Sequence, residues 1–462
     1  MHISASPGTA PPTDTGVPTT RAGASTTHRL NGGRDGATPG RAAQACVPAP
    51  HTPNASVAIR AKLIAAVPQG HAGDRTQAQA VAAETVRALY REGLYQPGEI
   101  SCDTITIAGR DSAGMEHALM VTLERWLERV DEGTGERHIF ILAGSDHGLV
   151  PVLGNVPTDS VVITAFAGHK LTADLKTARH LPAITALPAS AVTDQERAAL
   201  ASRTTLVLVP GVAHDVTEAS IAQAARDYQK KGGKPLPGID GDTVTILLGG
   251  DVVDSDEATH TQTVRRLSAD DARKQARHIA ELELAGRDRC RFVIVSSPRT
   301  GKFAPDGTEA TPNPHRTGTR DDVTRAFEET LRGYPNAQVD VYDFQYGETS
   351  AYRPLLHAYQ QAPGHTGRIH VAGDSVSMIS EVASLLPGTM VVNETASMDD
   401  SHRRTAQAIA ADSGIAVLQG DGRFLPGKGA QAKRLESAAK RIATAIVARI
   451  RDGVPNRSET AA

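Results

Sequence analysis

Three stretches of this 462-residue chain decide its fold: Thr243–Asp251 reads TVTILLGGD, Ala269–Leu284 reads ADDARKQARHIAELEL, and Arg291–Ser296 reads RFVIVS. The first and third are short runs rich in Val, Ile and Leu, which is typical of strands buried on both faces of a sheet. The middle stretch repeats its apolar residues at helical spacing. A strand, a helix and a second strand in this order predict a right-handed crossover between two parallel strands.

The same alternation extends in both directions from these stretches. Toward the N-terminus we expect strands at Ala61–Val67, Thr104–Ala108, His138–Ala143, Ser160–Ala165, Ala183–Ala186 and Thr204–Val209, and helices at Thr76–Arg91 and Met115–Val130. Toward the C-terminus we expect strands at Gln338–Tyr342, Arg368–Ala372 and Thr389–Val392, and helices at Asp321–Arg332, Ser377–Leu386 and Ala430–Arg451. The Gly- and Pro-rich segment Lys230–Asp242 is typical of a linker.

These elements predict an α/β protein with two Rossmann-like, doubly wound domains of parallel strands that face each other across a cleft. The first domain is expected at residues 55–235 and the second at 236–429, followed by a C-terminal helix and tail at 430–462. Sheets of this kind bind ligands in the crevice outside the carboxyl ends of their strands. We therefore look for functional residues in the loops that follow the strands.

The composition excludes several classes of function. Lys and Arg total 49 against 52 for Asp and Glu, which disfavours a nucleic-acid or membrane-surface partner. Aromatic residues make up only 3% of the chain, so few rings are available to stack on bases. No apolar run is long enough to predict a membrane span. The three cysteines, Cys46, Cys102 and Cys290, have the spacing of neither a metal site nor a disulfide framework.

The N-terminal segment Met1–Asn54 is rich in Ser, Thr, Pro, Gly and Ala and has almost no large apolar residues. Such a composition buries too little surface to offset the entropy of ordering the chain, so we expect disorder. One interpretation is the tail of a cytoplasmic protein. The other is an export leader of the kind carried by type III secreted effectors. Composition leaves both open.

Three strand ends in the second half have the chemistry of a phosphate or nucleotide site. Gly249 and Gly250 end one strand and could make room for a phosphate. Ser296, Arg299 and Lys302 supply a hydroxyl and two cations after the next strand. The segment Asp374–Glu381 offers hydroxyls and backbone N–H groups at a helix start, through Ser375 and Ser377, and a carboxylate for ribose hydroxyls in Glu381. The alternatives are a tight turn, solvated loop charges and a plain helix cap.

The first half offers histidines in loops after strands. His71 follows Gly70 in the loop after the first strand and is a candidate general base, because histidine titrates near neutrality. His169 and the adjacent pair His214-Asp215 follow later strands and could bind or deprotonate an acceptor. The alternative is that these side chains only hold their loops through hydrogen bonds. The sequence contains no Walker A, HExxH or G-x-S-x-G pattern.

These motifs, in this order, resemble the mitochondrial fission "elongated mitochondria" (ELM) family and its bacterial homologues, over about Ala61 to Gly420. The family signature Asp-Ser-x-Ser-Met-x-x-Glu is intact as Asp374, Ser375, Ser377, Met378 and Glu381. Elements of the first half resemble Gly70-His71, Gln77, Gly168-His169 and His214-Asp215, and those of the second half resemble Gly249-Gly250 and Arg299-Thr300. One arginine is lost before Arg299, only Tyr352 remains of an Asn-Pro-Tyr element, and Leu386–Thr389 is degraded, so the chain resembles a divergent member.

The resemblance implies a function, because the family is itself similar to GT-B glycosyltransferases. It implies that Glu381 holds a ribose, that Gly249-Gly250, Ser375 and Ser377 face the phosphates, and that a C-terminal helix packs back across the hinge. The implied reaction is transfer of sugar from a nucleoside-diphosphate sugar, UDP- or GDP-linked, with no metal and no further cofactor. His71 would act as base, with Gly70, Gln77, His169, His214 and Asp215 on the acceptor side.

Two other functions stay open at this stage. One is a non-catalytic binding or adaptor protein with a protein partner, since the plant relatives are linked to recruiting fission machinery. The other is a nucleotide-sugar epimerase or hydrolase that uses the same donor groove.

Overall fold

The computed structural model describes residues 60–68, 72–107, 117, 119–121, 123–124, 136–143, 149–156, 162–256 and 261–452. The segment Met1–Asn54, the loop residues Gly70 and His71, and most of the helix expected at Met115–Val130 lie outside the described residues. Within the described ranges, no helix has the length and apolar character needed to cross a membrane.

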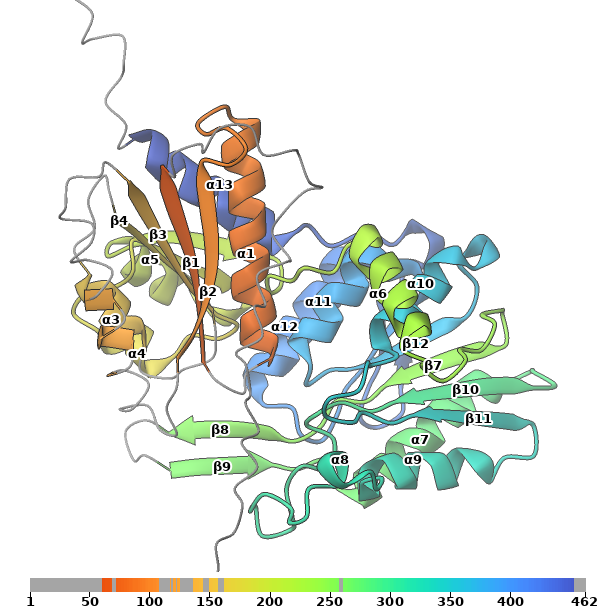
Figure 1. Cartoon of the computed structure of the whole chain (residues 1–462). Coiled ribbons are helices and arrows are strands. Elements are labelled where there is room, and N and C mark those ends of the chain that lie inside the picture. The colour runs from red at the N-terminus through yellow and green to blue at the C-terminus, as the bar shows by residue number, and fades with distance from the viewer. Residues whose placement is uncertain are drawn as a thin grey trace, which may run out of the picture. The chain divides into compact units, whose positions relative to one another are not determined.

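The first domain is built on six parallel strands in the order β2-β1-β3-β4-β5-β6 (Figure 1). The strands are β1 (Ala61–Pro68), β2 (Ile100–Ile107), β3 (Arg137–Ala143), β4 (Val162–Ala167), β5 (Ile184–Pro188) and β6 (Thr205–Val209). Its helices are α1 (Ala72–Arg91), α3 (Leu149–Asn155), α4 (Ala173–Thr177), the 3-10 turn η1 (Ala189–Ala191) and α5 (Asp194–Ala201). All residues of β4 and β5 are buried, as expected of parallel strands with both faces covered.

The second domain is built on seven strands in the order β11-β10-β7-β12-β13-β14-β15, and only the last pair is antiparallel. The strands are β7 (Thr243–Leu247), β10 (Cys290–Val295), β11 (Ala337–Tyr342), β12 (Arg368–Ala372), β13 (Met390–Asn393), β14 (Ala416–Leu418) and β15 (Phe424–Leu425). The chain leaves β7 in one direction for β10 and β11, and later returns to add β12 on the other side of β7. This change of direction places the expected ligand crevice between β7 and β12.

The helices of the second domain pack on the two faces of this sheet. One core contains residues of α7 (Ala269–Leu284) and α9 (Asp322–Arg332). The other contains residues of α10 (Tyr352–Gln361), α11 (Val376–Leu385) and α12 (Asp400–Ser413). The remaining elements are the hairpin β8 (Val252–Asp256) and β9 (Thr261–Arg265), α8 (Pro314–Thr317), and the 3-10 turns η2 (Pro363–His365), η3 (Pro387–Thr389) and η4 (Gly429–Gln431). Of these elements, α8, α10, α12, β14, β15 and the hairpin were not expected from the sequence.

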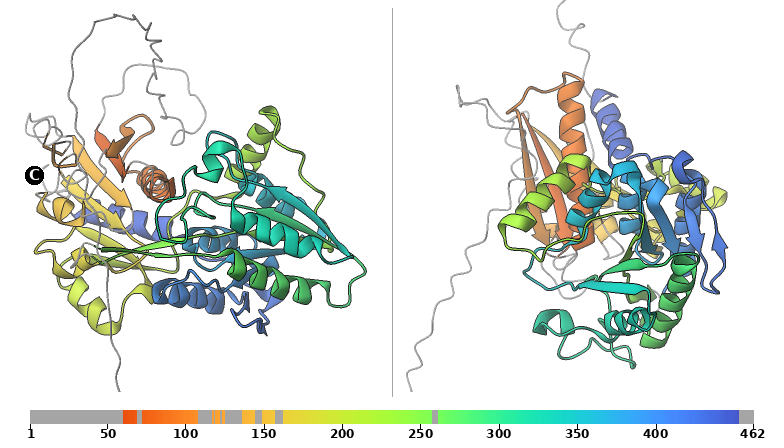
Figure 2. Two further views of the ribbon diagram at one scale, coloured as in Figure 1. Left: turned by 90° about the horizontal axis from the view of Figure 1, so that it is seen from below. Right: turned by 90° about the vertical axis from the view of Figure 1, so that its right-hand side faces the viewer.

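Two helices show where the chain crosses between the two domains. Buried residues of α13 (Ala438–Asp452) belong to the core of the first domain, and Figure 2 shows α13 beside α1. This return agrees with the C-terminal helix expected from the GT-B resemblance, although the helix begins at Ala438 rather than at Ala430. Conversely, α6 (Glu218–Lys230) packs against α10 in the core of the second domain. The chain therefore crosses between the two cores before α6, whereas we expected a linker at Lys230–Asp242.

Both crossings contact α11. On the first crossing, the N–H of Val212 donates to Ser380 Oγ at 3.1 Å, and a Cβ at Gly211 would lie only 2.5 Å from the same oxygen. On the second, the N–H of Leu435 donates to the carbonyl of Ala383 at 3.0 Å. The helix that carries the Asp-Ser-x-Ser-Met-x-x-Glu signature is thereby held by both connections. The fold class is thus as expected: two parallel, Rossmann-like α/β sheets with helices on both faces.

Candidate functional site

The start of α11 offers hydrogen-bond donors at the carboxyl end of β12, where a ligand was expected. Its N-cap residue Ser375 makes no side-chain capping bond, and Ser375 and Ser377 are half-buried. Within the described residues, neither hydroxyl forms a hydrogen bond, and the backbone N–H groups of Val376, Ser377 and Met378 have no acceptor. A helix start of this kind favours anions, because its free N–H groups and the helix dipole point the same way.

Asp374, two residues before this helix begins, makes hydrogen bonds within the chain, so it is not left for a ligand. Its carboxylate is buried and accepts from the N–H of Gly250 at 3.0 Å, from Arg299 Nη2 at 2.9 Å and from Thr395 Oγ1 at 2.9 Å. The carboxylate lies so close that a Cβ added at Gly249 would be 2.2 Å from Asp374 Oδ1. Asp374 thus joins the loops that follow β7, β10, β12 and β13.

This contact corrects our interpretation of the glycine pair. A Cβ at Gly250 would lie 2.2 Å from the carbonyl carbon of Arg299. The space that Gly249 and Gly250 leave is therefore filled by Asp374 and by the backbone of Arg299, not reserved for a phosphate. The two glycines are required because three loops approach one another closely at the mouth of the sheet.

The expected phosphate ligands after β10 also have partners within the chain. Ser296 is buried, and its hydroxyl donates to Asp343 Oδ1 at 2.6 Å, so it anchors a loop instead of facing a ligand. Arg299 pairs with Asp374, but its side chain is 37% exposed and keeps an edge toward solvent. The ammonium of Lys302 lies 5.2 Å from the centre of the Phe303 ring. Of these three, Arg299 alone contacts Asp374, at the carboxyl end of β12.

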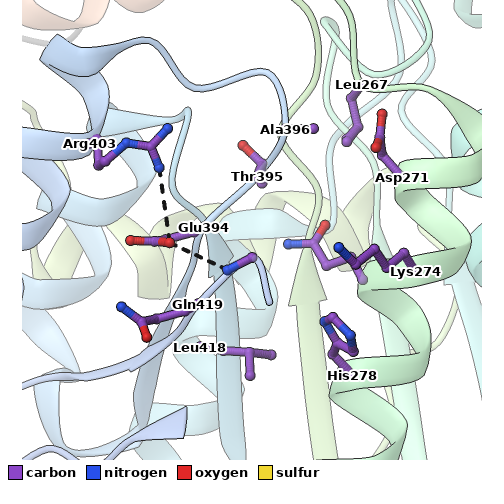
Figure 3. A pocket seen from close by; sticks show the side chains of 12 residues that line it. Leu267, Asp271, Lys274, His278, Glu394, Thr395, Ala396, Arg403, Leu418 and Gln419 are labelled. Atoms are coloured by element: carbon purple, nitrogen blue, oxygen red, sulfur yellow. Dashed lines mark hydrogen bonds and ion pairs between the residues drawn. The ribbon is translucent and has the colours of Figure 1, made fainter. Parts of the chain in front are cut away.

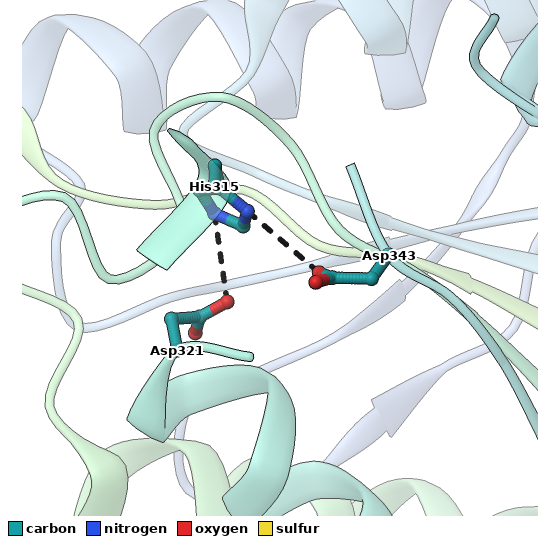
Figure 4. Close-up of side chains that lie close together, drawn as sticks. All are labelled: His315, Asp321 and Asp343. Atoms are coloured by element: carbon teal, nitrogen blue, oxygen red, sulfur yellow. Dashed lines mark ion pairs between the residues drawn. The ribbon is translucent and has the colours of Figure 1, made fainter. Parts of the chain in front are cut away.

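A buried histidine supports the loop that carries Arg299. His315 Nε2 lies 2.7 Å from the carbonyl oxygen of Thr300, and Nδ1 lies 2.9 Å from that of Phe344. Carbonyl oxygens only accept hydrogen bonds, so each ring nitrogen of His315 lies where an N–H group could donate. The carboxylates of Asp321 and Asp343 lie 3.5 Å and 3.7 Å from the two ring nitrogens (Figure 4).

The same three side chains are close enough to be considered as metal ligands. A histidine ligand must offer a ring lone pair to the metal. Both nitrogens of His315 instead point at carbonyl oxygens, so the ring is committed to donating hydrogen bonds. We therefore interpret this group as a buried charge cluster that fixes the Thr300 loop.

Glu381 has different surroundings from Asp374. It lies one helical turn beyond Ser377 on α11, is buried, and accepts a hydrogen bond from Tyr352 Oη at 2.6 Å. Burial raises the pKa of Glu381 to about 7, although the Tyr352 hydroxyl and the nearby Arg353 both oppose the rise. Its Oε1 forms no hydrogen bond with any described residue, which leaves an acceptor available beside the helix start.

His214 and Asp215, expected on the acceptor side, lie instead beside Glu381. Both oxygens of Asp215 accept from the guanidinium of Arg353 on α10. Burial lowers the pKa of His214 to about 4, so the ring is neutral at pH 7, and its Nδ1 forms no hydrogen bond of normal geometry. The adjacent pair therefore does not act as a His-Asp unit: Asp215 is committed to Arg353.

A second polar cluster lies where β4 of the first domain meets α12 of the second. His169 is half-buried, desolvation lowers its pKa to about 4, and its ring centre is 6.4 Å from that of His402. His402 Nδ1 lies 2.7 Å from Asp399 Oδ1, a contact that directs the lone pair to Nε2. On α1, Gln77, also expected on the acceptor side, is buried with its Oε1 unpaired.

The sequence analysis missed Asp399 and His402, which form this dyad. The available signal was local: Asp399 is the N-cap of α12, and His402 follows three residues later, where it can reach the capping carboxylate. Gly70 and His71, also expected on this side, lie outside the described residues.

Comparison with other proteins adds only distant likenesses. No family model and no curated protein matches the sequence. Among solved structures, the chain is similar to a UDP-forming α,α-trehalose-phosphate synthase from Burkholderia vietnamiensis, at 13% identity and a TM-score of 0.37 over 85% of this chain and 96% of that one. It is also similar to UGT89C1 of Arabidopsis thaliana, at 10% identity and a TM-score of 0.32 over 86% and 91%. A LacI-type transcriptional regulator from Bacteroides fragilis is matched at 8% identity and a TM-score of 0.25 over 86% and 91%. These structural likenesses are too weak to indicate a function, so the function proposed below rests on the chain's own geometry.

Proposed function

We propose that this chain is a metal-independent glycosyltransferase that binds a nucleoside-diphosphate sugar, UDP- or GDP-linked, between β7 and β12. The observation that carries the proposal is the face of α11 on which Ser377 and Glu381 lie one turn apart. The unpaired N–H groups at its start suit a diphosphate, and the free oxygen of Glu381 suits ribose hydroxyls. One helical turn, about 5 Å, separates the two, comparable with the spacing of phosphate and ribose in a nucleotide.

The proposed reaction assigns a role to each group. A base takes the proton of an acceptor hydroxyl, the oxygen attacks the anomeric carbon, and the bond to the diphosphate breaks with its electron pair. The exposed edge of Arg299 and the start of α11 stabilise the departing diphosphate. The base is His71, as expected from the sequence, or His402, whose Nε2 lone pair is oriented by Asp399.

We also propose membership of the ELM family. In support, two of its collinear elements, Gly249-Gly250 and Asp374, contact each other in the fold. A non-catalytic binding or adaptor role on the same fold is the second candidate. The adaptor role is favoured because Asp374 and Ser296, both expected to bind a ligand, form hydrogen bonds within the chain instead. An epimerase or hydrolase would use the same donor groove.

Isothermal titration of the full chain with UDP, GDP, ADP and CDP tests the donor site. We expect one nucleotide to bind with a Kd in the micromolar range, and Glu381→Gln to weaken it by about tenfold or more, because charge-assisted hydrogen bonds to ribose are lost. The matched control is Glu329→Gln, an exposed glutamate on α9. Kd values above about 1 mM for all four nucleotides would exclude both the transferase and the epimerase or hydrolase.

Product analysis separates the remaining candidates. If a nucleotide binds but its sugar conjugate is not converted, the adaptor role is favoured. Release of free sugar or of an isomer favours the hydrolase or epimerase.

We also propose a cytoplasmic location, with type III export as the alternative for Met1–Asn54. A reporter fused to Met1–Asn54 that is not secreted would exclude export.

A further inference from the structure

A pocket of about 250 Å³ lies at the carboxyl ends of β13 and β14, on the side of the sheet covered by α7 (Figure 3). One wall is the α7 stripe Asp271, Lys274, Gln275 and His278, whose spacing of three and four residues places them on one helical face. The opposite wall comes from the loops after β13 and β14 and from α12, through Glu394, Thr395, Arg403, Gln419 and Gly420.

The carboxylates in this pocket are already in use. Glu394 Oε1 accepts from Gln407 Nε2 at 3.2 Å, and Oε2 accepts from the N–H of Gly420 at 3.3 Å. Asp271 Oδ2 accepts from Ser268 Oγ at 2.6 Å in the capping box of α7. Each oxygen of Glu394 therefore accepts one hydrogen bond, and Asp271 Oδ1 accepts none from the described residues.

The donors in the pocket are largely unused. Lys274 forms no ion pair or hydrogen bond with a described residue, and Arg403 comes only to 4.0 Å from Glu394 Oε2. Figure 3 shows Lys274 and His278 on the opposite side of the pocket from Arg403. An ammonium offers three donors and a guanidinium five, so the site has more donors than acceptors and lacks a partner rich in oxygen lone pairs.

We propose that this pocket binds a phosphate monoester of a small polar molecule such as a sugar, with Lys274 and Arg403 on the phosphate group. A phosphate offers several strong acceptors to both cations at once. The volume is below the usual 300–1,000 Å³ of drug-sized sites and suits a molecule of about the size of a hexose phosphate. Gln275 and Gln419 line the remaining space and can bind hydroxyl groups.

This site is separate from the proposed nucleotide site. Thr395 lines the pocket and donates to Asp374, so the Asp374 contacts form the wall between the two. The inference therefore does not depend on the proposed glycosyl transfer, and the two can fail independently.

Calorimetric titration of the full chain with glucose 6-phosphate, inorganic phosphate and glucose tests the proposal. We expect glucose 6-phosphate to bind with a Kd below about 1 mM, glucose to bind at least about tenfold more weakly, and Lys274→Ala and Arg403→Ala each to weaken the phosphate ester by about tenfold. Tighter binding of glucose 6-phosphate than of phosphate identifies a phosphorylated metabolite, and equal binding identifies free phosphate as the source of the same group.

The matched controls are Arg277→Ala on α7 and Arg404→Ala on α12, exposed neighbours that do not line the pocket. Both should bind glucose 6-phosphate like the unchanged chain. Lys274→Ala should also leave nucleotide binding unchanged, which separates this test from that of the proposed function. The proposal is overturned if neither phosphate compound binds below about 10 mM, or if Lys274→Ala and Arg403→Ala bind as tightly as the controls.

Discussion

Asp374 and Glu381 belong to one eight-residue signature, and both are buried carboxylates, but their surroundings differ. Asp374 accepts three hydrogen bonds from three separate loops, one of them from a guanidinium. Glu381 accepts one hydrogen bond, from Tyr352, and its pKa is raised to about 7 because burial outweighs that bond. Two carboxylates of one motif can thus have different roles: Asp374 holds loops together, and Glu381 remains available to a ligand.

The difference has an energetic consequence. A buried carboxylate with a cation and two further donors is stabilised as an anion, and removing it leaves its partners unsatisfied. A buried carboxylate with one donor is destabilised as an anion until a ligand supplies more. Four substitutions, taken from the largest expected effect to the smallest, test whether this contrast is correct.

Asp374→Asn should lower the free energy of unfolding by about 3–5 kcal/mol, because Arg299 then loses the buried anion that balances its charge. Urea unfolding monitored by circular dichroism measures the change. The control Asp270→Ala removes a carboxylate that is 93% exposed and should change stability by less than about 0.5 kcal/mol. A loss below about 1 kcal/mol for Asp374→Asn would mean that the carboxylate does not hold the loops together.

Gly249→Ala should lower the free energy of unfolding by roughly 1–3 kcal/mol, because its Cβ would lie 2.2 Å from Asp374 Oδ1 and force the carboxylate away from its donors. Gly238→Ala is the control, since no atom lies within 4 Å of a Cβ there. The same urea experiment reports both. If the two variants were equally stable, the close contact at the sheet mouth would be incorrect.

Glu381→Gln should raise the free energy of unfolding above pH 7 by on the order of 1–2 kcal/mol. The folded protein holds the Glu381 proton up to about pH 7, whereas the unfolded chain releases it near 4.5. Stability from this group is therefore fully present below pH 4.5 and is lost as the pH rises from 4.5 to 7. Thermal unfolding between pH 5 and pH 8 should show a smaller decline for the variant than for the unchanged chain; parallel curves would refute the raised pKa.

Tyr352→Phe should have the smallest effect. It removes the hydrogen bond at 2.6 Å that favours the ionised carboxylate, so the pKa of Glu381 should rise further. The stability decline should still begin near pH 4.5, but its upper end should move upward by roughly one pH unit. Tyr346→Phe, at an exposed tyrosine, is the control. The same thermal unfolding profiles measure this shift. A decline that ends at the same pH as in the unchanged chain would show that Tyr352 does not act on Glu381.

Much of the fold was predictable because its signals are local. Apolar strand runs and helical spacing indicated the principal strands of both sheets, and α7 was predicted with its observed bounds. The helix α11 was predicted within one residue at each end, so Glu381 was correctly expected in its first turns. Shorter or more polar helices such as α10 and α12 lack a distinctive pattern and were missed.

What the sequence by itself determined is therefore the order of strands and helices, the parallel α/β class and the residues that share the face of α11. Only the tertiary structure decided which polar groups were left for a ligand. Asp374 meets Gly250 across 124 residues of chain. The helix α13 packs with the first domain although it follows the second in sequence, and α6 packs with the second domain although it lies within residues 55–235, expected as the first. Periodicity and capping act within a few residues, whereas hydrogen-bond partners between loops depend on how distant strands come together in the sheet.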